Sequence, residues 1–155
     1  MKRSLSFLLV LLFLADGLLW AGLGSHAALY VGGTISQIKE RTEGSVSLVD
    51  EKSLVFQHKG GKLDIPYRQV NSLEYGQKAG RRLGLSLAVS PLFLLSKKRR
   101  HYLTIGYLDE GGKQQAAIFE LGKDAIQPTI SGLEAKTGKK IEYEDEEARK
   151  SAVGK

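Results

Sequence analysis

Short runs of alternating apolar and polar residues, separated by turn residues, fill most of the chain between positions 34 and 121. A period of two is typical of antiparallel strands that bury one face against a core. Glycines in the turns at 59–61 and 110–113 suit hairpins, because glycine tolerates positive φ. The pattern predicts a mainly β fold built on a small, strongly bent antiparallel sheet or roll. The runs expected to form strands are 34–40, 45–49, 53–58, 62–75, 101–110 and 114–121.

The hydrophobic period changes after position 121, where it becomes helical. Asp124 is expected to cap a helix over 124–137, Pro128 to lie in its first turn, and Gly138 to follow its last residue. A single amphipathic helix of this kind can close the open end of a bent sheet. The apolar face of this helix has the spacing i, i+4, i+7 and consists of Ile126, Ile130 and Leu133.

The N-terminus has the features of an export signal. Lys2 and Arg3 precede a mostly apolar run at 5–24, and Ser25 and Ala27 have the spacing of a signal-peptidase site. The alternative is an uncleaved anchor, since about 20 mostly apolar residues can span a bilayer. Both interpretations place the remainder outside the cytoplasm, as a secreted or periplasmic protein that can be membrane-attached.

The length of 155 residues leaves room for one domain after an export segment. We expect an export signal or anchor at 1–27 and a β domain at 28–143, with a short last strand at 140–144. An apolar insertion at 78–100 interrupts this domain, and a charged, flexible tail is expected at 144–155.

The insertion departs from the β pattern that surrounds it. Residues Leu83 to Leu95 carry no charge and lie between two clusters of cations. The net charge of the chain is +6, and no acidic residue occurs between Lys78 and Arg100, so the excess positive charge is local. Two short helices broken at 90–91 are expected, because Ser followed by Pro suits the start of a helix.

Three interpretations of the insertion stay open. It can be part of the core with a solvated basic fringe, because about 10–14 apolar residues are more often core than membrane span. It can lie in a membrane interface, or it can dock onto a protein partner. The membrane is favoured, since an exposed apolar patch of this kind is an aggregation hazard in a soluble monomer. The residues expected to contact membrane or partner are Arg81, Arg82, Leu83, Leu85, Leu87, Val89, Leu92, Phe93, Leu94, Leu95, Lys97, Lys98, Arg99 and Arg100.

Motifs for catalysis or metal binding are absent from the sequence. The lack of cysteine excludes disulfides, Cys-based zinc sites and thiol nucleophiles. His26, His58 and His101 do not have the spacing of metal ligands, and neither a GxSxG elbow nor a phosphate-binding loop occurs. We therefore expect no cofactor, no metal and no small-molecule substrate. Nucleic acid is not expected as a partner, because no aromatic platform accompanies the cations at 97–100.

The arrangement resembles the pleckstrin-homology-like (PH-like) superfold, in particular its GRAM-like and bacterial PH-like members. The likeness rests on the meander "GSVSLVDEKSLVFQHKGGKLDIPYRQVNSLEYG", the hairpin "HYLTIGYLDEGGKQQAAIFEL" and the closing helix "KDAIQPTISGLEAKTG", within about residues 34–143. It implies binding of lipid headgroups, peptides or proteins rather than catalysis. The loop "KERTEGS" is not strongly basic, so phosphoinositide binding is not carried over.

The expected function follows from these features together. We expect an exported, non-enzymatic domain that associates with an anionic membrane surface through its basic-flanked apolar insertion. The alternative is a protein–protein interaction module that uses the same segment for docking, and an enzyme of unknown class is less favoured.

Overall fold

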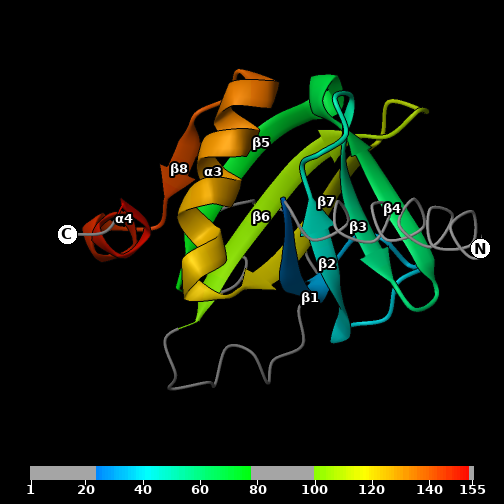
Figure 1. The fold of residues 1–155 in the computed structure, drawn as a ribbon. Coiled ribbons are helices and arrows are strands. Elements are labelled where there is room, and N and C mark those ends of the chain that lie inside the picture. Colours follow the sequence, from blue (N-terminus) through cyan, green and yellow to red (C-terminus); the bar gives the residue numbers. More distant parts are fainter. Residues whose placement is uncertain (1–23, 78–99, 154–155) are drawn as a thin grey trace, which may run out of the picture.

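The computed structural model of the chain describes residues 24–77 and 100–153. In these two stretches the protein is mainly β, with one eight-stranded sheet and two α-helices (Figure 1). The predicted export segment up to residue 23 and the predicted insertion from 78 to 99, including its two expected helices, lie outside the described residues.

The strands are ordered β4-β3-β2-β1-β7-β6-β5-β8 across the sheet. Neighbouring strands are antiparallel except β5 and β8, which are parallel. The predicted mainly β fold with an antiparallel sheet is confirmed, and the parallel β8 is its one departure among the described strands. The strand bounds are β1 Ser25–Gly33, β2 Thr42–Ser47, β3 Ser53–His58, β4 Gly61–Pro66, β5 Val70–Gly76, β6 His101–Leu108, β7 Gln114–Leu121 and β8 Ile141–Tyr143.

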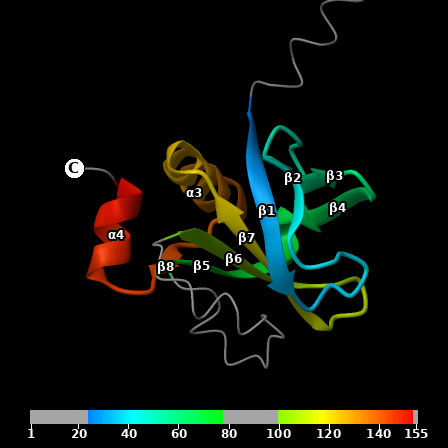
Figure 2. The ribbon, with the colours of Figure 1, turned by 90° about the horizontal axis from the view of Figure 1, so that it is seen from below.

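β1 joins the two halves of the sheet, with β2–β4 on one side and β7, β6 and β5 on the other (Figure 2). Its register against β7 shifts between Tyr30 and Gly32, and such irregularities bend a strand. The core lies between the two halves. Phe56 of β3 has its ring centroid 5.0 Å from that of Phe119 in β7 and 6.4 Å from that of Tyr30 in β1.

The start of the sheet differs from the prediction. β1 was not predicted, because residues 25–27 were assigned to the export segment. The predicted strand at 34–40 is wrong, since residues 34–41 form the loop between β1 and β2, and the chain enters β2 at Thr42. Ile38 in this loop is nevertheless 8% exposed and belongs to the core. The apparent alternation therefore reflects a loop that buries one apolar side chain.

The connection between β2 and β3 and the connection between β3 and β4 both occur at residues that favour turns. Oδ1 of Asp50 accepts hydrogen bonds from the amides of Lys52 and Ser53, both at 2.8 Å, and this closes the turn between β2 and β3. Gly61 begins β4 with a φ of 139°, which favours glycine. β4 ends at Pro66 and is an edge strand, as a proline without an amide donor requires.

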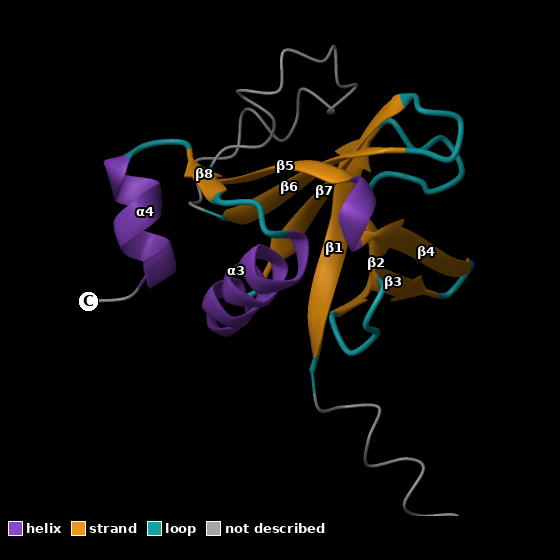
Figure 3. Ribbon diagram, turned by 90° about the horizontal axis from the view of Figure 1, so that it is seen from above, coloured by secondary structure: helices purple, strands orange, loops and turns teal. Residues whose placement is uncertain are grey.

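The helix α3 (Lys123–Thr137) packs on the core side of the sheet (Figure 3). Gly138 ends it in the left-handed conformation, with a φ of 69°, as predicted. Its start differs from the prediction, because Gly122 is the N-cap and Asp124 lies in the first turn without capping. Pro128 lies inside the helix rather than in its first turn. The predicted apolar face is confirmed by the burial of Ile126, Ile130 and Leu133.

A second helix occupies the region predicted to be a flexible tail. The helix α4 (Glu146–Val153) follows Asp145, whose Oδ1 accepts a hydrogen bond of 2.7 Å from the amide of Ala148. Ala148 and Ala152 are 0% and 5% exposed and belong to the core. The prediction of a flexible tail is therefore wrong for α4, and two helices rather than one follow the antiparallel strands.

Candidate functional site

Of the residues predicted to contact a membrane or a partner, Arg100 is the one that the structure describes. Its Nη1 donates to both carboxylate oxygens of Glu120, each at 2.7 Å, and this hydrogen bonding raises the pKa of Arg100. The ion pair holds the chain against β7 immediately before β6 begins. The other predicted contacts lie outside the described residues and are Arg81, Arg82, Leu83, Leu85, Leu87, Val89, Leu92, Phe93, Leu94, Leu95, Lys97, Lys98 and Arg99.

The chain leaves the sheet before the insertion at the end of β5, and it re-enters the sheet after the insertion at the start of the neighbouring strand β6. Gly76, the last residue of β5, pairs with Tyr102 near the start of β6. The amide of Gln77 donates to Oε2 of Glu144 at 3.0 Å, which holds the departing chain against the residue after β8. Residues 78–99 therefore connect two strands that already pair with each other.

The first strand begins along the same edge of the sheet. Ala28 pairs with Leu121 in β7, and Leu121 pairs with His101 in β6. Because adjacent strands lie about 4.8 Å apart, Ala28 and His101 are separated by roughly 10 Å along this row. We call this the shared edge, defined by Ala28, Leu121, His101 and Gly76. The apolar runs at 5–24 and 83–95 both join the sheet through it, the first by way of residues 25–27.

A partly buried group of hydrogen-bonded side chains lies beside the shared edge. The hydroxyl of Tyr75 is 2.5 Å from Nδ1 of His101 and 3.1 Å from Oγ of Ser151 in α4. Ser151 donates in turn to the carbonyl of Ala148 at 2.8 Å. Burial raises the pKa of Tyr75 and lowers the pKa of His101, so both groups are neutral near pH 7.

This group fastens α4 to the sheet and does not form a nucleophile. The proton of Ser151 is directed to the carbonyl of Ala148, whereas a nucleophilic serine needs a general base at its own oxygen. His101 and Ser151 instead approach the same oxygen of Tyr75 from two elements. The arrangement therefore connects β5, β6 and α4 next to the ends of the insertion.

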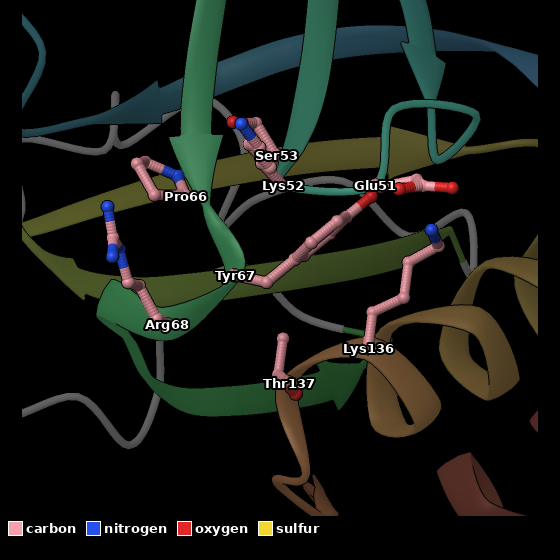
Figure 4. A pocket seen from close by; sticks show the side chains of 8 residues that line it. All are labelled: Glu51, Lys52, Ser53, Pro66, Tyr67, Arg68, Lys136 and Thr137. Carbon is pink, nitrogen blue, oxygen red and sulfur yellow. The ribbon is translucent and has the colours of Figure 1, made fainter.

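A hollow of about 660 Å³ lies at the far end of β4 and β5, beside the short 3-10 helix η1 (Tyr67–Gln69). Tyr67 is buried there, and its hydroxyl donates to the carbonyl of Asp50 at 3.3 Å. Burial and the charge of Asp50 raise the pKa of Tyr67 to about 12. The lining residues are Glu51, Lys52, Ser53, Pro66, Tyr67, Arg68, Lys136 and Thr137 (Figure 4).

The cations of this hollow do not converge on one point. Nζ of Lys136 is 3.1 Å from the carbonyl of Asp50 and 5.2 Å from the centroid of the Tyr67 ring, so it is already engaged. Figure 4 shows Arg68 and Lys136 on opposite sides of the Tyr67 ring. An anion bound by one of them would therefore not meet the other, and the hollow is a weak candidate for a binding site.

Within the described stretches, no cluster of three or more histidine or acidic side chains is placed to hold a metal ion. No helix in the same stretches is both long enough and apolar enough to cross a membrane.

Sequence reasoning missed the attachment of α4, because the segment is strongly polar overall and the two residues that it buries, Ala148 and Ala152, are small. It also missed what the continuous apolar run at 116–119 indicates. Unbroken apolar runs in strands are typical of burial on both faces of a sheet. A comparison with protein-family models and with curated proteins finds no match for this chain.

Proposed function

We propose that this chain is a non-enzymatic, extracytoplasmic domain that associates with an anionic membrane surface through the basic-flanked segment, defined as residues 81–100. The observation that carries the proposal is the shared edge, where the apolar runs at 5–24 and 83–95 both join the sheet. A domain held to a bilayer by its N-terminal run has this edge close to the lipid. The second apolar run then starts within reach of the headgroups.

The composition of the basic-flanked segment suits a membrane interface. It contains eight large apolar side chains between positions 83 and 95. Burial of each is worth about 1.5–3 kcal/mol, so burial of half of them would contribute about 6–12 kcal/mol. Each Lys or Arg close to an anionic surface adds about 1 kcal/mol. Both terms favour lipid contact over exposure to water.

The proposal includes the PH/GRAM-like interpretation of the fold. The meander β2–β4, the hairpin β6–β7 and the packing of α3 on the core support it. Domains with this resemblance usually bind a lipid headgroup, a peptide or a protein, which agrees with a binding role here. β8 and α4 are additions to the pattern that carries the resemblance.

The pairing of β1 favours an uncleaved anchor over a cleaved signal peptide. Cleavage after Ala27 would remove three residues of β1, Ser25–Ala27, which pair with β2 residues 45–47. Retention keeps β1 whole and holds the shared edge at the bilayer. Mass spectrometry of the protein from membrane fractions should therefore find Met1, with or without its formyl group. A mature N-terminus at Ala28 would contradict the anchor.

Binding of the full chain to preformed vesicles tests the proposed function. Replacement of Leu92, Phe93 and Leu94 by Ser should weaken binding to anionic vesicles, because three apolar contacts with lipid are lost. Thermal stability should change little if these side chains face lipid. Loss of vesicle binding together with unfolding would contradict the proposal. Co-purification of a protein that depends on these residues, with no vesicle binding, would favour the protein–protein alternative.

A matched pair of variants isolates the role of the cations. Each variant removes four positive charges, and only the first removes them from the basic-flanked segment. The first should bind anionic vesicles as weakly as neutral ones, and raised salt should mimic it because the Debye length falls to about 3 Å at 1 M. Equal loss in both variants, or no loss in either, would contradict the proposal. The first set is Arg81→Gln, Arg82→Gln, Lys97→Gln and Lys98→Gln, and the control set is Lys59→Gln, Lys113→Gln, Lys139→Gln and Lys140→Gln.

A further inference from the structure

A second layer of buried side chains lies on the face of β5, β6, β7 and β1 opposite the core. In β7, Ala117 and Phe119 belong to the core, whereas Ala116 and Ile118 do not. Glu74 pairs with Thr104 in β6, and Thr104 pairs with Ile118, so these three share one face. We call this the outward face. Its buried residues are Val31, Glu74, Tyr102, Thr104, Ala116 and Ile118.

These six residues of the outward face are as buried as the core. Val31, Ala116 and Ile118 are 0% exposed, and Tyr102 and Thr104 are 3% exposed. An uncovered sheet face would leave such side chains open to water. Their burial therefore requires a covering layer.

The described elements do not supply this layer. The buried residues of α3 and α4 belong to the core cluster, on the opposite face. Figure 3 shows α3 on one side of β5–β7 and α4 beyond β8 at the edge of the sheet. Among residues 24–77 and 100–153, both α-helices therefore bury their apolar side chains in the core, and neither lies on the outward face (Figure 3).

We propose that residues 83–95 dock on the outward face and form its cover. The connection from Gln77 to Arg100 begins and ends at β5 and β6, two of the strands that form this face. Thr104 lies four positions along β6 from Arg100, roughly 13 Å away. Half of the connection, about 11 residues, can reach roughly 36 Å when extended. The segment is therefore long enough to cover the face and return.

Charge complementarity favours the same occupant. The outward face carries two acids, Glu74 at 7% exposure and Glu120, which pairs with Arg100. Cations flank the apolar run on both sides, and one of them, Arg100, already pairs with Glu120 on this face. The N-terminal run is a poorer match, because its cations are at positions 2 and 3, far from the point where it joins β1.

This inference deepens the proposed function without depending on it. A segment held on the outward face has one side on the sheet and leaves its other side for lipid. If the membrane proposal also holds, the outward face is the side of the domain that lies on the bilayer. The docking itself is tested on the sheet, apart from any lipid.

Cysteine protection tests the docking, because the chain has no cysteine of its own. Ala116→Cys places a thiol on the outward face, and Ala117→Cys, its neighbour, places one in the core; both positions are 0% exposed. Val49→Cys, at a position that is 61% exposed, gives the rate for an open thiol. In the loop-replaced variant, a short Gly-Ser linker replaces residues 78–99 between the paired ends of β5 and β6.

In the full chain, the thiols at 116 and 117 should both react far more slowly with a maleimide than the thiol at 49. In the loop-replaced variant, the thiol at 116 should approach the rate at 49, while the thiol at 117 stays protected. A reactive thiol at 116 in the full chain would overturn the docking. Continued protection at 116 in the loop-replaced variant would overturn it too, because another segment would then be the cover.

A second measurement applies if the loop-replaced variant does not fold, which a reactive thiol at 117 would reveal. In the full chain, Ala116→Cys is combined with one cysteine at 84, 86, 88 or 90, the small residues that alternate with the large apolar ones, and disulfide formation is driven by an oxidant. At least one of these pairs should crosslink within the monomer, whereas Val49→Cys paired with the same positions should not. Absence of any crosslink to position 116 would overturn the docking. Neither result depends on vesicle binding, so the two proposals can fail separately.

Discussion

Replacing Ile118 by Ala measures how much the cover of the outward face contributes to stability. Ile118 is 0% exposed and lies outside the core cluster. Truncation of a fully buried Ile to Ala lowers the free energy of unfolding by about 2–5 kcal/mol, and truncation to Val by about 0.5–1.5 kcal/mol. The same truncation on an open surface changes it by only about 0.5 kcal/mol. The loss should therefore depend on the presence of residues 78–99.

Urea unfolding followed by circular dichroism gives the four free energies of this cycle. Ile118→Ala should cost about 2–5 kcal/mol in the full chain and less than about 1 kcal/mol in the loop-replaced variant. Phe119→Ala, on the core face of the same strand, should cost about 3–5 kcal/mol in both, because its neighbours Tyr30 and Phe56 are unchanged. An equal loss for Ile118→Ala in both backgrounds would refute the reasoning, as would a negligible loss in the full chain.

Three further changes test the fold around the shared edge. Tyr75→Phe removes the hydroxyl that joins His101 to Ser151, so hydrogen exchange in α4 should speed up more than in α3. Gly138→Ala should lower the thermal midpoint, because φ is 69° there, and Gly122→Ala at a φ of −65° should lower it less, because only the N-cap preference for glycine over alanine is lost. Burial lowers the pKa of His101 in the folded state, so its neutral form is favoured and stability falls as pH drops below about 6.5. His101→Gln should flatten this part of the pH profile.

The strands with clear turns could be predicted from the sequence. β3 and β4 flank one glycine-containing turn, β6 and β7 flank another, and α3 shows a helical period before Gly138. β1 could not be predicted in the same way, because its sequence "SHAALYVGG" continues the small and apolar residues of the N-terminal run. The run at 34–40 alternates like a strand, yet its Ile38 reaches the core from a loop.

Other features depend on contacts far apart in the sequence. The parallel pairing of β8 with β5 joins residues that are about 70 positions apart in a three-residue strand too short to show a pattern. α4 is held by two small side chains and by the hydroxyl contact of Ser151 with Tyr75. The sequence "AAIF" at 116–119 indicates the burial of the outward face, because apolar residues occupy both the core-facing and the outward-facing positions of this strand.

The contact of residues 83–95 with lipid is the central claim, and site-specific quenching measures it most directly. An environment-sensitive dye is attached to a single cysteine at 85, 87, 93 or 95 in the full chain, in anionic vesicles that carry lipid-linked quenchers. The proposal predicts strong quenching at one or more of these positions and none at position 108, which is 40% exposed and lies at the end of β6 opposite His101. Quenching for a dye within 5–24 with none at any of the four positions would contradict it.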